Sequence, residues 1–393
     1  MRRISAHQMQ SCQAGRVADI TKRVTRLSDG RELIYFDDAD TSLPPDRAAD
    51  TRPPAPRPAL PELRQDPLTG EWVSIAAARQ NRAFLPPAAL DPLAPATPGN
   101  PTELPADYDV AVFENRLPSF GPRLPGDDHD GHPGADGGDG DGPDSIGIGR
   151  SRPGYGRCEV VCFGPQRTGS WASFSWSRAR TVVEAWADRT AVLSRLPGIR
   201  QVYVFENRGA EIGVTLHHPH GQIYGYPFVT PRTRNLLDSV ARYGPSLMAD
   251  ILSFEARSDR LLITGEHFTV FVPFAARWPV EVHMLPHRPV PDLASASDAE
   301  RDEIAVLYPR LLRALDRLYD TPTPYIAGWH QAPVPSGQPV PGIRLMLQVT
   351  SPRRAADRLK FRAGSETGMG AFIGDIVPEE AAARLRAALA SGD

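Results

Sequence analysis

The stretch that decides the fold is Gly213-Val-Thr-Leu-His-His-Pro-His-Gly-Gln-Ile-Tyr-Gly-Tyr-Pro227. Read as a β-strand, it places alternate side chains on one face, so His218, His220 and Gln222 line up together. Two imidazoles and an amide are costly to bury without partners. A neutral imidazole is a capable nucleophile when a hydrogen-bond acceptor holds its other nitrogen. The stretch therefore indicates a nucleophilic histidine or a metal site, with satisfied core histidines as the plainer interpretation.

The chain around this stretch has the composition of a globular protein. Its 393 residues suffice for about two domains. Acidic residues number 47 and basic residues 44, so the net charge of −3 gives no electrostatic case for a nucleic-acid or membrane partner. Cys12, Cys158 and Cys162 are too few for a disulfide framework and suit a reducing compartment. With no apolar N-terminal run and no membrane-spanning stretch, we expect a cytoplasmic protein.

Two segments have the composition of disordered chain. Residues 1–60 are predicted to be largely disordered, because residues 41–61 are rich in Pro, Asp and Arg and poor in large apolar side chains. One short strand is possible there, at residues 32–36. Residues 123–148 form a Gly- and Asp-rich insert that is also predicted to be disordered.

The ordered part of the chain repeats its own pattern. We expect a first half at residues 61–235 and a second half at residues 236–393, each with a helix, a strand, a turn and a further strand in that order. The expected elements are a helix at 175–196 with strands at 201–205 and 213–227, and a helix at 297–319 with strands at 325–330 and 344–349. This order predicts an internal duplication whose second copy lacks the histidines. The fold class expected is α+β.

Several short blocks then carry a family resemblance. They are Asp66-Pro-Leu-Thr-Gly-Glu-Trp72, Val112-Phe-Glu-Asn115, Phe205-Glu-Asn-Arg-Gly209, His218-Pro-His-Gly-Gln222, Ala327-Gly-Trp-His330, and Leu359-Lys-Phe361 with Gly364-Ser-Glu366. From about Leu63 to its C-terminus the chain resembles the galactose-1-phosphate uridylyltransferases, a branch of the histidine-triad superfamily. The resemblance implies two tandem histidine-triad-like halves, each an antiparallel sheet with packed helices, that form one half-barrel-like sheet.

The resemblance also implies a chemistry. His220 would attack the α-phosphorus of UDP-glucose, form a uridylyl-histidine and release glucose 1-phosphate; galactose 1-phosphate would then take the uridylyl group to give UDP-galactose. Gln222 would hold the phosphoryl oxygens. An amide cannot act as a proton donor in acid catalysis. Because a sugar phosphate is a good leaving group, transfer between two of them does not need an acid.

Further site residues follow from the same resemblance. Family positions near the phosphates and the nucleotide correspond to Arg79, Arg82, Asn115, Asn207, Gly213, Val214 and Thr215. On spacing alone the two arginines would be a solvated surface pair. Lys360 and Glu366 match a segment that reaches the sugar phosphate from the partner subunit, so we expect a homodimer with shared active sites.

The family metals are not expected here. The positions that correspond to the zinc ligands hold Asp91, Ala94, Arg167 and His218, of which only His218 is a strong ligand. At a second family metal site His330 remains, but Met346 and Gln348 replace a histidine pair and Arg344 lies close by. We therefore expect no cofactor, and the backbone carbonyl of His218 is predicted to orient the ring of His220.

Two other functions remain open on the sequence. One is nucleotidyl transfer on a different nucleotide or sugar, as in an ADP-sugar phosphorylase. The other is a non-catalytic nucleotide-sugar binding protein, which the retention of both His220 and Gln222 argues against, because a binder needs no nucleophile.

Overall fold

The computed structural model describes residues 20–81, 85–122, 148–334 and 340–392. Its strands are β1 (Thr21–Arg26), β2 (Glu32–Asp37), β3 (Glu62–Gln65), β4 (Trp72–Ile75), β5 (Val110–Glu114), β6 (Arg150–Pro153), β7 (Arg157–Cys162), β8 (Gln201–Arg208), β9 (His220–Tyr226), β10 (Leu261–Thr264), β11 (Phe268–Phe271), β12 (Val280–Pro286), β13 (Tyr325–His330), β14 (Met346–Ser351), β15 (Arg353–Ala355) and β16 (Arg358–Leu359). The helices are α2 (Trp176–Leu193), α3 (Pro231–Tyr243), α4 (Leu247–Glu255), α5 (Asp298–Arg317), α6 (Gly364–Gly368) and α7 (Pro378–Ala390), with short 3-10 turns η1 (Ala77–Asn81), η2 (Ala88–Leu90), η3 (Trp171–Ser173) and η4 (Ala210–Ile212).

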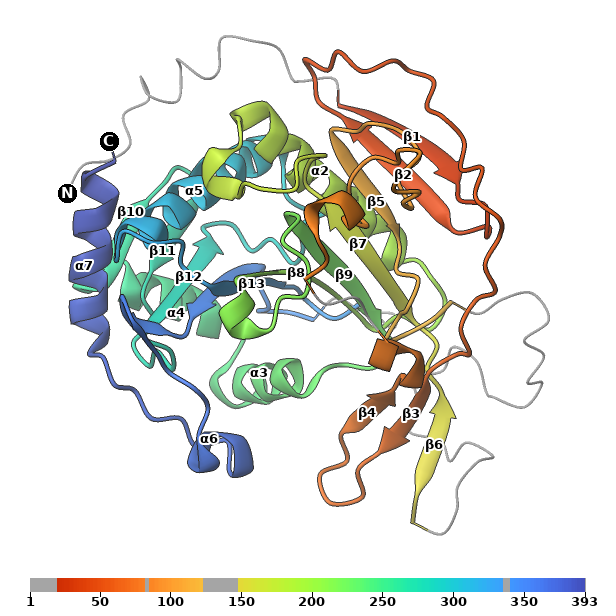
Figure 1. Cartoon of the computed structure of the whole chain (residues 1–393). Helices are drawn as coiled ribbons and strands as arrows, with labels where there is room; N and C mark the ends of the chain where they lie inside the picture. The colour runs from red at the N-terminus through yellow and green to blue at the C-terminus, as the bar shows by residue number, and fades with distance from the viewer. Residues whose placement is uncertain (1–19, 82–84, 123–147, 335–339, 393) are drawn as a thin grey trace.

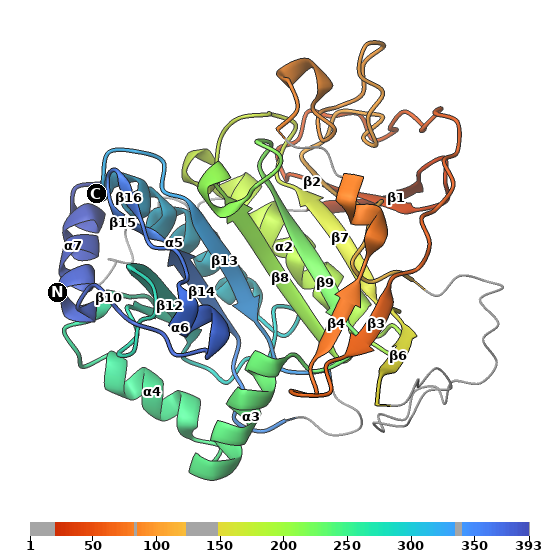
Figure 2. The same ribbon diagram turned by 60° about the horizontal axis from the view of Figure 1, so that its bottom comes forward.

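Eleven strands form one sheet in the order β1-β2-β5-β7-β9-β8-β13-β14-β12-β11-β10. Its pairings are antiparallel throughout, and Figures 1 and 2 show it running through the whole molecule. The two halves of the chain join in this sheet where β8 pairs with β13. The α+β fold class predicted from the sequence is confirmed. The histidine-bearing strand β9 lies in the interior of this sheet, between β7 and β8.

Helices α2 and α5 cover one face of the sheet. The side chain of Ser175 caps α2 by accepting from the backbone N–H of Arg178, and Ser297 and Glu300 form a capping box at the start of α5. Beneath them lies an aromatic core built around Trp171, Trp186, Tyr308 and Trp329. Burying such large apolar surfaces anchors both helices on the sheet. Because this core covers only one face of the sheet, the other face can carry polar groups.

The N-terminal segment differs from the sequence prediction. Residues 20–60 are not disordered: β1 and β2 extend the main sheet, and Leu33 to Phe36 are buried. Two guanidinium groups, of Arg23 and Arg47, bond the buried carboxylate of Asp37. Composition predicted disorder because it does not reveal a strand partner elsewhere in the chain, and here that partner is β5. The predicted insert 123–148 lies, except for Ile148, outside the described residues.

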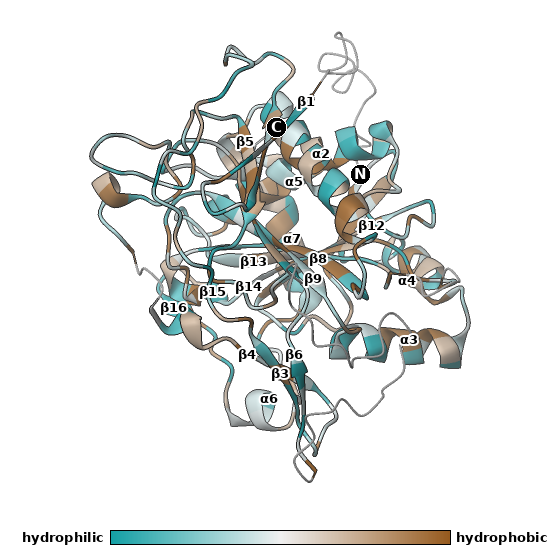
Figure 3. Cartoon of the chain, turned by 90° about the vertical axis from the view of Figure 1, so that its right-hand side faces the viewer, coloured by the Kyte–Doolittle hydropathy of each residue, from teal (hydrophilic) through white to brown (hydrophobic). Residues whose placement is uncertain are grey.

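Helices α3 and α4 were not predicted from the sequence. In Figure 3 α3 shows alternating polar and apolar stripes, as expected of a helix with one face to solvent. The small sheet β4-β3-β6 stands apart from the main sheet, and its strands β3 and β6, with sequences ELRQ and RSRP, are polar. In the described parts of the chain, no helix has the length and apolar character that a bilayer crossing requires.

Candidate active site

The histidine stretch is only partly a strand. Strand β9 begins at His220, and residues 214–219 are irregular. His220 and Gln222 therefore share one face, as predicted, but His218 does not continue that row; its ring turns into the protein and is buried. Pro219 has no N–H for a ladder hydrogen bond, which accounts for the interruption.

His220 is held in one tautomer. Its Nδ1 lies 2.7 Å from the backbone carbonyl oxygen of His218. A carbonyl oxygen can only accept, so Nδ1 carries the proton and Nε2 keeps its lone pair. Burial lowers the pKa of His220, although the hydrogen bond to His218 opposes the change. The ring is thus neutral near pH 7, as a nucleophile must be, and the predicted role of the His218 carbonyl agrees with this geometry.

Gln222 lies two residues further along β9. The hydroxyl of Tyr224 donates to its Oε1 over 3.3 Å. The amide oxygen is therefore occupied, while the NH₂ group remains to donate to an anionic oxygen.

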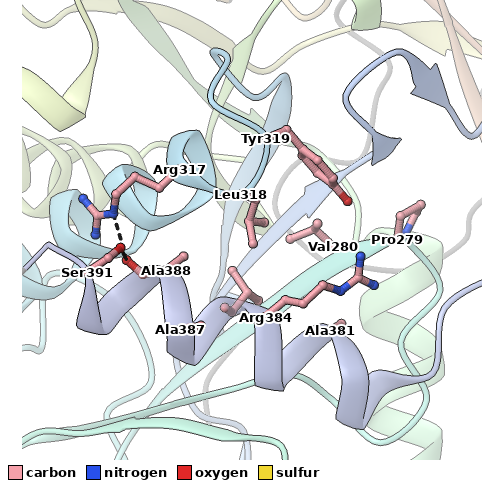
Figure 4. A pocket seen from close by; sticks show the side chains of 11 residues that line it. Pro279, Val280, Arg317, Leu318, Tyr319, Ala381, Arg384, Ala387, Ala388 and Ser391 are labelled. Carbon is pink, nitrogen blue, oxygen red and sulfur yellow. Dashed lines mark hydrogen bonds between the residues drawn. The ribbon is translucent and has the colours of Figure 1, made fainter.

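A pocket of about 480 Å³ opens beside His220. It lies at the ends of β8 and β9, and its wall includes Asn207, Val214, Arg167, His218 and Glu206. Its volume suits a small organic ligand. A second hollow, of about 350 Å³, lies between α5 and α7, where the Nε of Arg317 donates to the carbonyl of Ala388 (Figure 4). Its wall has neither an imidazole nor a carboxylate, so the His220 pocket is the better candidate for chemistry.

Glu206 is a buried acid that the sequence reasoning did not single out. Its Oε1 accepts from the hydroxyls of Tyr308 at 2.6 Å and Tyr325 at 2.7 Å, and its Oε2 from the indole N–H of Trp171 at 2.7 Å. Burial raises the pKa of Glu206 to about 7, and the three donors oppose that rise. The sequence does contain a signal for this burial. Side chains of β8 alternate between its two faces, and Glu206 follows Val202 and Val204 on the buried one.

Two of the four positions that correspond to the zinc ligands, Asp91 and His218, form a hydrogen-bonded cluster. The Nδ1 of His218 lies 2.8 Å from Oδ2 of Asp91, and its Nε2 lies 2.7 Å from the carbonyl oxygen of Gly164. Burial raises the pKa of Asp91, but hydrogen bonds from His218 and Leu93 outweigh it, so the pKa is lowered. Both ring nitrogens are already occupied by oxygen partners.

The other two positions, Ala94 and Arg167, provide no zinc ligand. Ala94 has only a methyl group, and Arg167 donates to the carbonyl of Pro86 and adds positive charge. One carboxylate and one imidazole do not make a tetrahedral site. The residues present do not fit zinc. Within the described ranges, no group of three or more His, Cys, Asp or Glu side chains is placed to hold a metal ion.

The second family metal position holds a chain of neutral and charged hydrogen bonds. The Nε2 of His330 lies 3.1 Å from Oε1 of Gln348, whose NH₂ donates to Glu281 at 2.6 Å. Burial lowers the pKa of His330 to about 3. Arg344 points elsewhere, donating to the carbonyls of Pro286 and His287.

The remaining predicted residues fall in different places. Arg79 donates to the carbonyl of Leu117, and Asn115 accepts from the N–H of the same residue, so both organise one loop. Arg82 lies outside the described residues. The loop of Gly213, Val214 and Thr215 precedes β9; Gly213 has φ of 82°, and the Thr215 carbonyl accepts from Leu85. Asn207 is exposed at the end of β8.

Lys360 and Glu366 lie together but do not line the His220 pocket. Their Nζ and Oε1 are 2.9 Å apart, both side chains are buried, and Nζ also donates to the carbonyl of Arg277. Hydrogen bonding to Lys360 lowers the pKa of Glu366.

This geometry defines a class of protein. A neutral histidine with an unprotonated Nε2, an amide two residues later and a pocket at the strand ends are the parts that an enzyme with a histidine nucleophile requires.

The comparisons with known proteins define the family. The model of the galactose-1-phosphate uridyl transferase N-terminal domain matches residues 52–230, and that of the C-terminal domain matches residues 234–391. The chain belongs to the galactose-1-phosphate uridylyltransferase family.

Individual relatives agree with the family models. A galactose-1-phosphate uridylyltransferase of Streptomyces lividans is 45% identical over 320 residues, 79% of this chain and 81% of that protein. One from Thermotoga maritima is 35% identical over 329 residues, 83% and 98% of the two chains. A solved uridylyltransferase structure superposes with a TM-score of 0.70 at 30% identity, covering 84% of this chain and 99% of the other.

Proposed function

We propose that this chain transfers the uridylyl group of UDP-glucose to galactose 1-phosphate, with His220 as the nucleophile. Family membership supports the substrates. The single observation that carries the mechanism is the hydrogen bond from Nδ1 of His220 to the His218 carbonyl, which leaves Nε2 unprotonated beside the pocket.

The reaction proceeds in two displacements. The lone pair on Nε2 attacks the α-phosphorus, and the bond from that phosphorus to the bridging oxygen breaks. Glucose 1-phosphate leaves with the electron pair. The uridylylated ring keeps its Nδ1 proton and carries a positive charge, which the His218 carbonyl stabilises. A phosphate oxygen of galactose 1-phosphate then attacks the same phosphorus, the P–N bond breaks, and Nε2 recovers its lone pair.

Gln222 contributes a donor to the non-bridging phosphoryl oxygens and no proton transfer. Its oxygen accepts from the hydroxyl of Tyr224, so the NH₂ group is the part of the amide that is left to bind the phosphoryl oxygens. The charge on those oxygens is present throughout both displacements, and a fixed donor stabilises it without reorganisation.

Intact-mass spectrometry of the protein after incubation with UDP-glucose alone tests this proposal. We expect a mass gain of one uridylyl group that galactose 1-phosphate removes, and none in His220→Asn, which keeps a polar side chain without the nucleophile. Absence of any adduct in the unmodified protein would favour a non-catalytic binding protein. An adenylyl adduct with ADP-glucose instead would assign the chain to the ADP-sugar phosphorylases.

We further propose that the enzyme works without zinc and as a homodimer. The ligand positions support the first point, because they hold a methyl group, a guanidinium group and a hydrogen-bonded Asp91–His218 pair. Stoichiometric zinc in elemental analysis of the untagged protein would refute it. To test the second point, the His220→Asn and Lys360→Ala proteins are mixed so that they exchange subunits. If Lys360 of one subunit serves the pocket of its partner, each hybrid dimer has one intact site and the mixture regains activity. No recovery under subunit exchange would refute shared sites.

A further inference from the structure

A buried hydrogen-bonded clamp lies behind the nucleophile. Asp91 and His218 are 4% and 2% exposed and stand 127 residues apart in sequence. The ring of His218 is held on both sides, at Nδ1 by Asp91 and at Nε2 by the carbonyl of Gly164. The hydroxyl of Tyr108, 3.0 Å from Nε2, donates in turn to the carbonyl of Leu93.

Asp91 is itself fixed from two directions. Its Oδ1 accepts from the N–H of Leu93 at 3.0 Å, and its backbone carbonyl accepts from the side chain of Asn100 at 2.8 Å. An ionised carboxylate is costly to bury unless donors surround it, so this arrangement tolerates little displacement. A ring held at both nitrogens by fixed groups has one orientation.

The orientation of His218 passes directly to His220. The carbonyl of His218 is the group that accepts from Nδ1 of His220. Pro219, between the two histidines, has a restricted φ, and its own carbonyl accepts from the N–H of Phe163 at 3.2 Å. With the side chain of His218 and the carbonyl of Pro219 both held, the peptide unit between them cannot rotate freely.

We propose that Asp91 is a positioning residue for the nucleophile, acting through His218, and that this clamp does without metal what a bound zinc ion would do at the corresponding place. The proposal rests on the role of His220 given above. It follows from the disagreement between the residues present and the requirements of zinc. Asp91 and His218 together fix a carbonyl, and the carbonyl fixes the tautomer of His220.

The test compares Asp91→Asn with Asp37→Asn. Asp37 is an equally buried carboxylate, in β2, bonded to Arg23 and Arg47 and without contact to the pocket. In metal sites, loss of the outer partner that orients a ligating histidine typically lowers activity by about 10- to 100-fold, and we apply the same range to a histidine that is oriented without metal. We expect a loss of that size in kcat for Asp91→Asn, with KM within about twofold, and no such loss for Asp37→Asn. Equal losses in both variants would mean that Asp91 is merely structural.

Two further measurements test the proposal, and the first of them does so even if Asp91→Asn is poorly folded. Tyr108→Phe removes one outer partner of His218 and is expected to give a smaller loss. In a double-mutant cycle, Asp91→Asn should add nothing in a His218→Gln background, because its effect passes through that ring. Fully additive effects on single-turnover uridylylation would overturn the pathway.

Nitrogen-15 NMR reports the tautomer of the His220 ring, and so tests the clamp without a measurement of turnover. The unmodified protein is expected to show only the Nδ1–H tautomer, and Asp91→Asn a mixture of both. An unchanged tautomer in Asp91→Asn refutes the positioning role. The two proposals fail separately: a missing uridylyl adduct refutes the chemistry, whereas the tautomer measurement still reports on the clamp.

Discussion

The pH dependence of the free energy of unfolding should reveal that Glu206 takes up a proton on folding. Its pKa of about 7, against an ordinary 4.5, means that the folded state holds a proton that the unfolded state releases. At 1.36 kcal/mol per pKa unit, that difference corresponds to about 3 kcal/mol. The sign follows from linkage: the contribution is fully present below pH 4.5 and is lost as the pH rises through about 7.

Glu206→Gln removes this titration. The amide oxygen can accept from Tyr308 and Tyr325, but its NH₂ group meets the indole N–H of Trp171, which adds a destabilisation of about 1–3 kcal/mol at every pH. Denaturant unfolding of both proteins is measured between pH 4.5 and 8. We expect the advantage of the unmodified protein to shrink by about 3 kcal/mol across that range, and exposed Glu71→Gln to show no such trend. Parallel curves for the unmodified protein and Glu206→Gln would refute the reasoning.

Two other substitutions test packing and charge. Gly328→Ala would place a Cβ in collision with the hydroxyl and ring of Tyr203, so that ring must move; by thermal unfolding we expect a loss of stability of about 1–3 kcal/mol. Gly99→Ala, with open space around it, is the control, and equal melting temperatures would contradict the prediction. Arg189→Met removes the bidentate partner of the buried Glu159 carboxylate, which keeps the hydrogen bond from Nε of Arg157, and should cost about 3 kcal/mol, the lower end for breaking a buried ion pair. Arg64→Met, at an exposed pair, should change nothing measurable, and similar losses in both would show that burial does not decide the effect.

Much of the fold could be predicted because its elements depend on local pattern. The strand at Tyr325–His330 and the helix after Ser297 were predicted almost to the residue, since a short apolar run and a helix N-cap are encoded within a few positions. The disorder predicted for residues 20–60 was wrong because β2 is stable only beside β5. Composition contains no information on such distant pairing.

The site shows the same division. The sequence indicated His220, Gln222 and even the carbonyl of His218, because they lie within five consecutive residues. It did not indicate that Asp91 would bond the ring of His218, since that contact joins segments far apart in the chain. The strand interpretation of His218 failed at Pro219, which has no N–H to donate to the ladder.

The pairing of β8 with β13 has a consequence for folding while the chain is being translated. Strand β8 ends at Arg208, and the residue that pairs with it, Tyr325, is made 117 residues later (325 minus 208). At elongation rates of about 5 to 20 residues per second, the ribosome takes roughly 6 to 23 s to cover that distance. Throughout that interval one edge of β8 has unpaired backbone groups, which other chains can bind. A chain truncated before residue 325 keeps that edge permanently open, so truncated products should aggregate even though the histidine segment is complete.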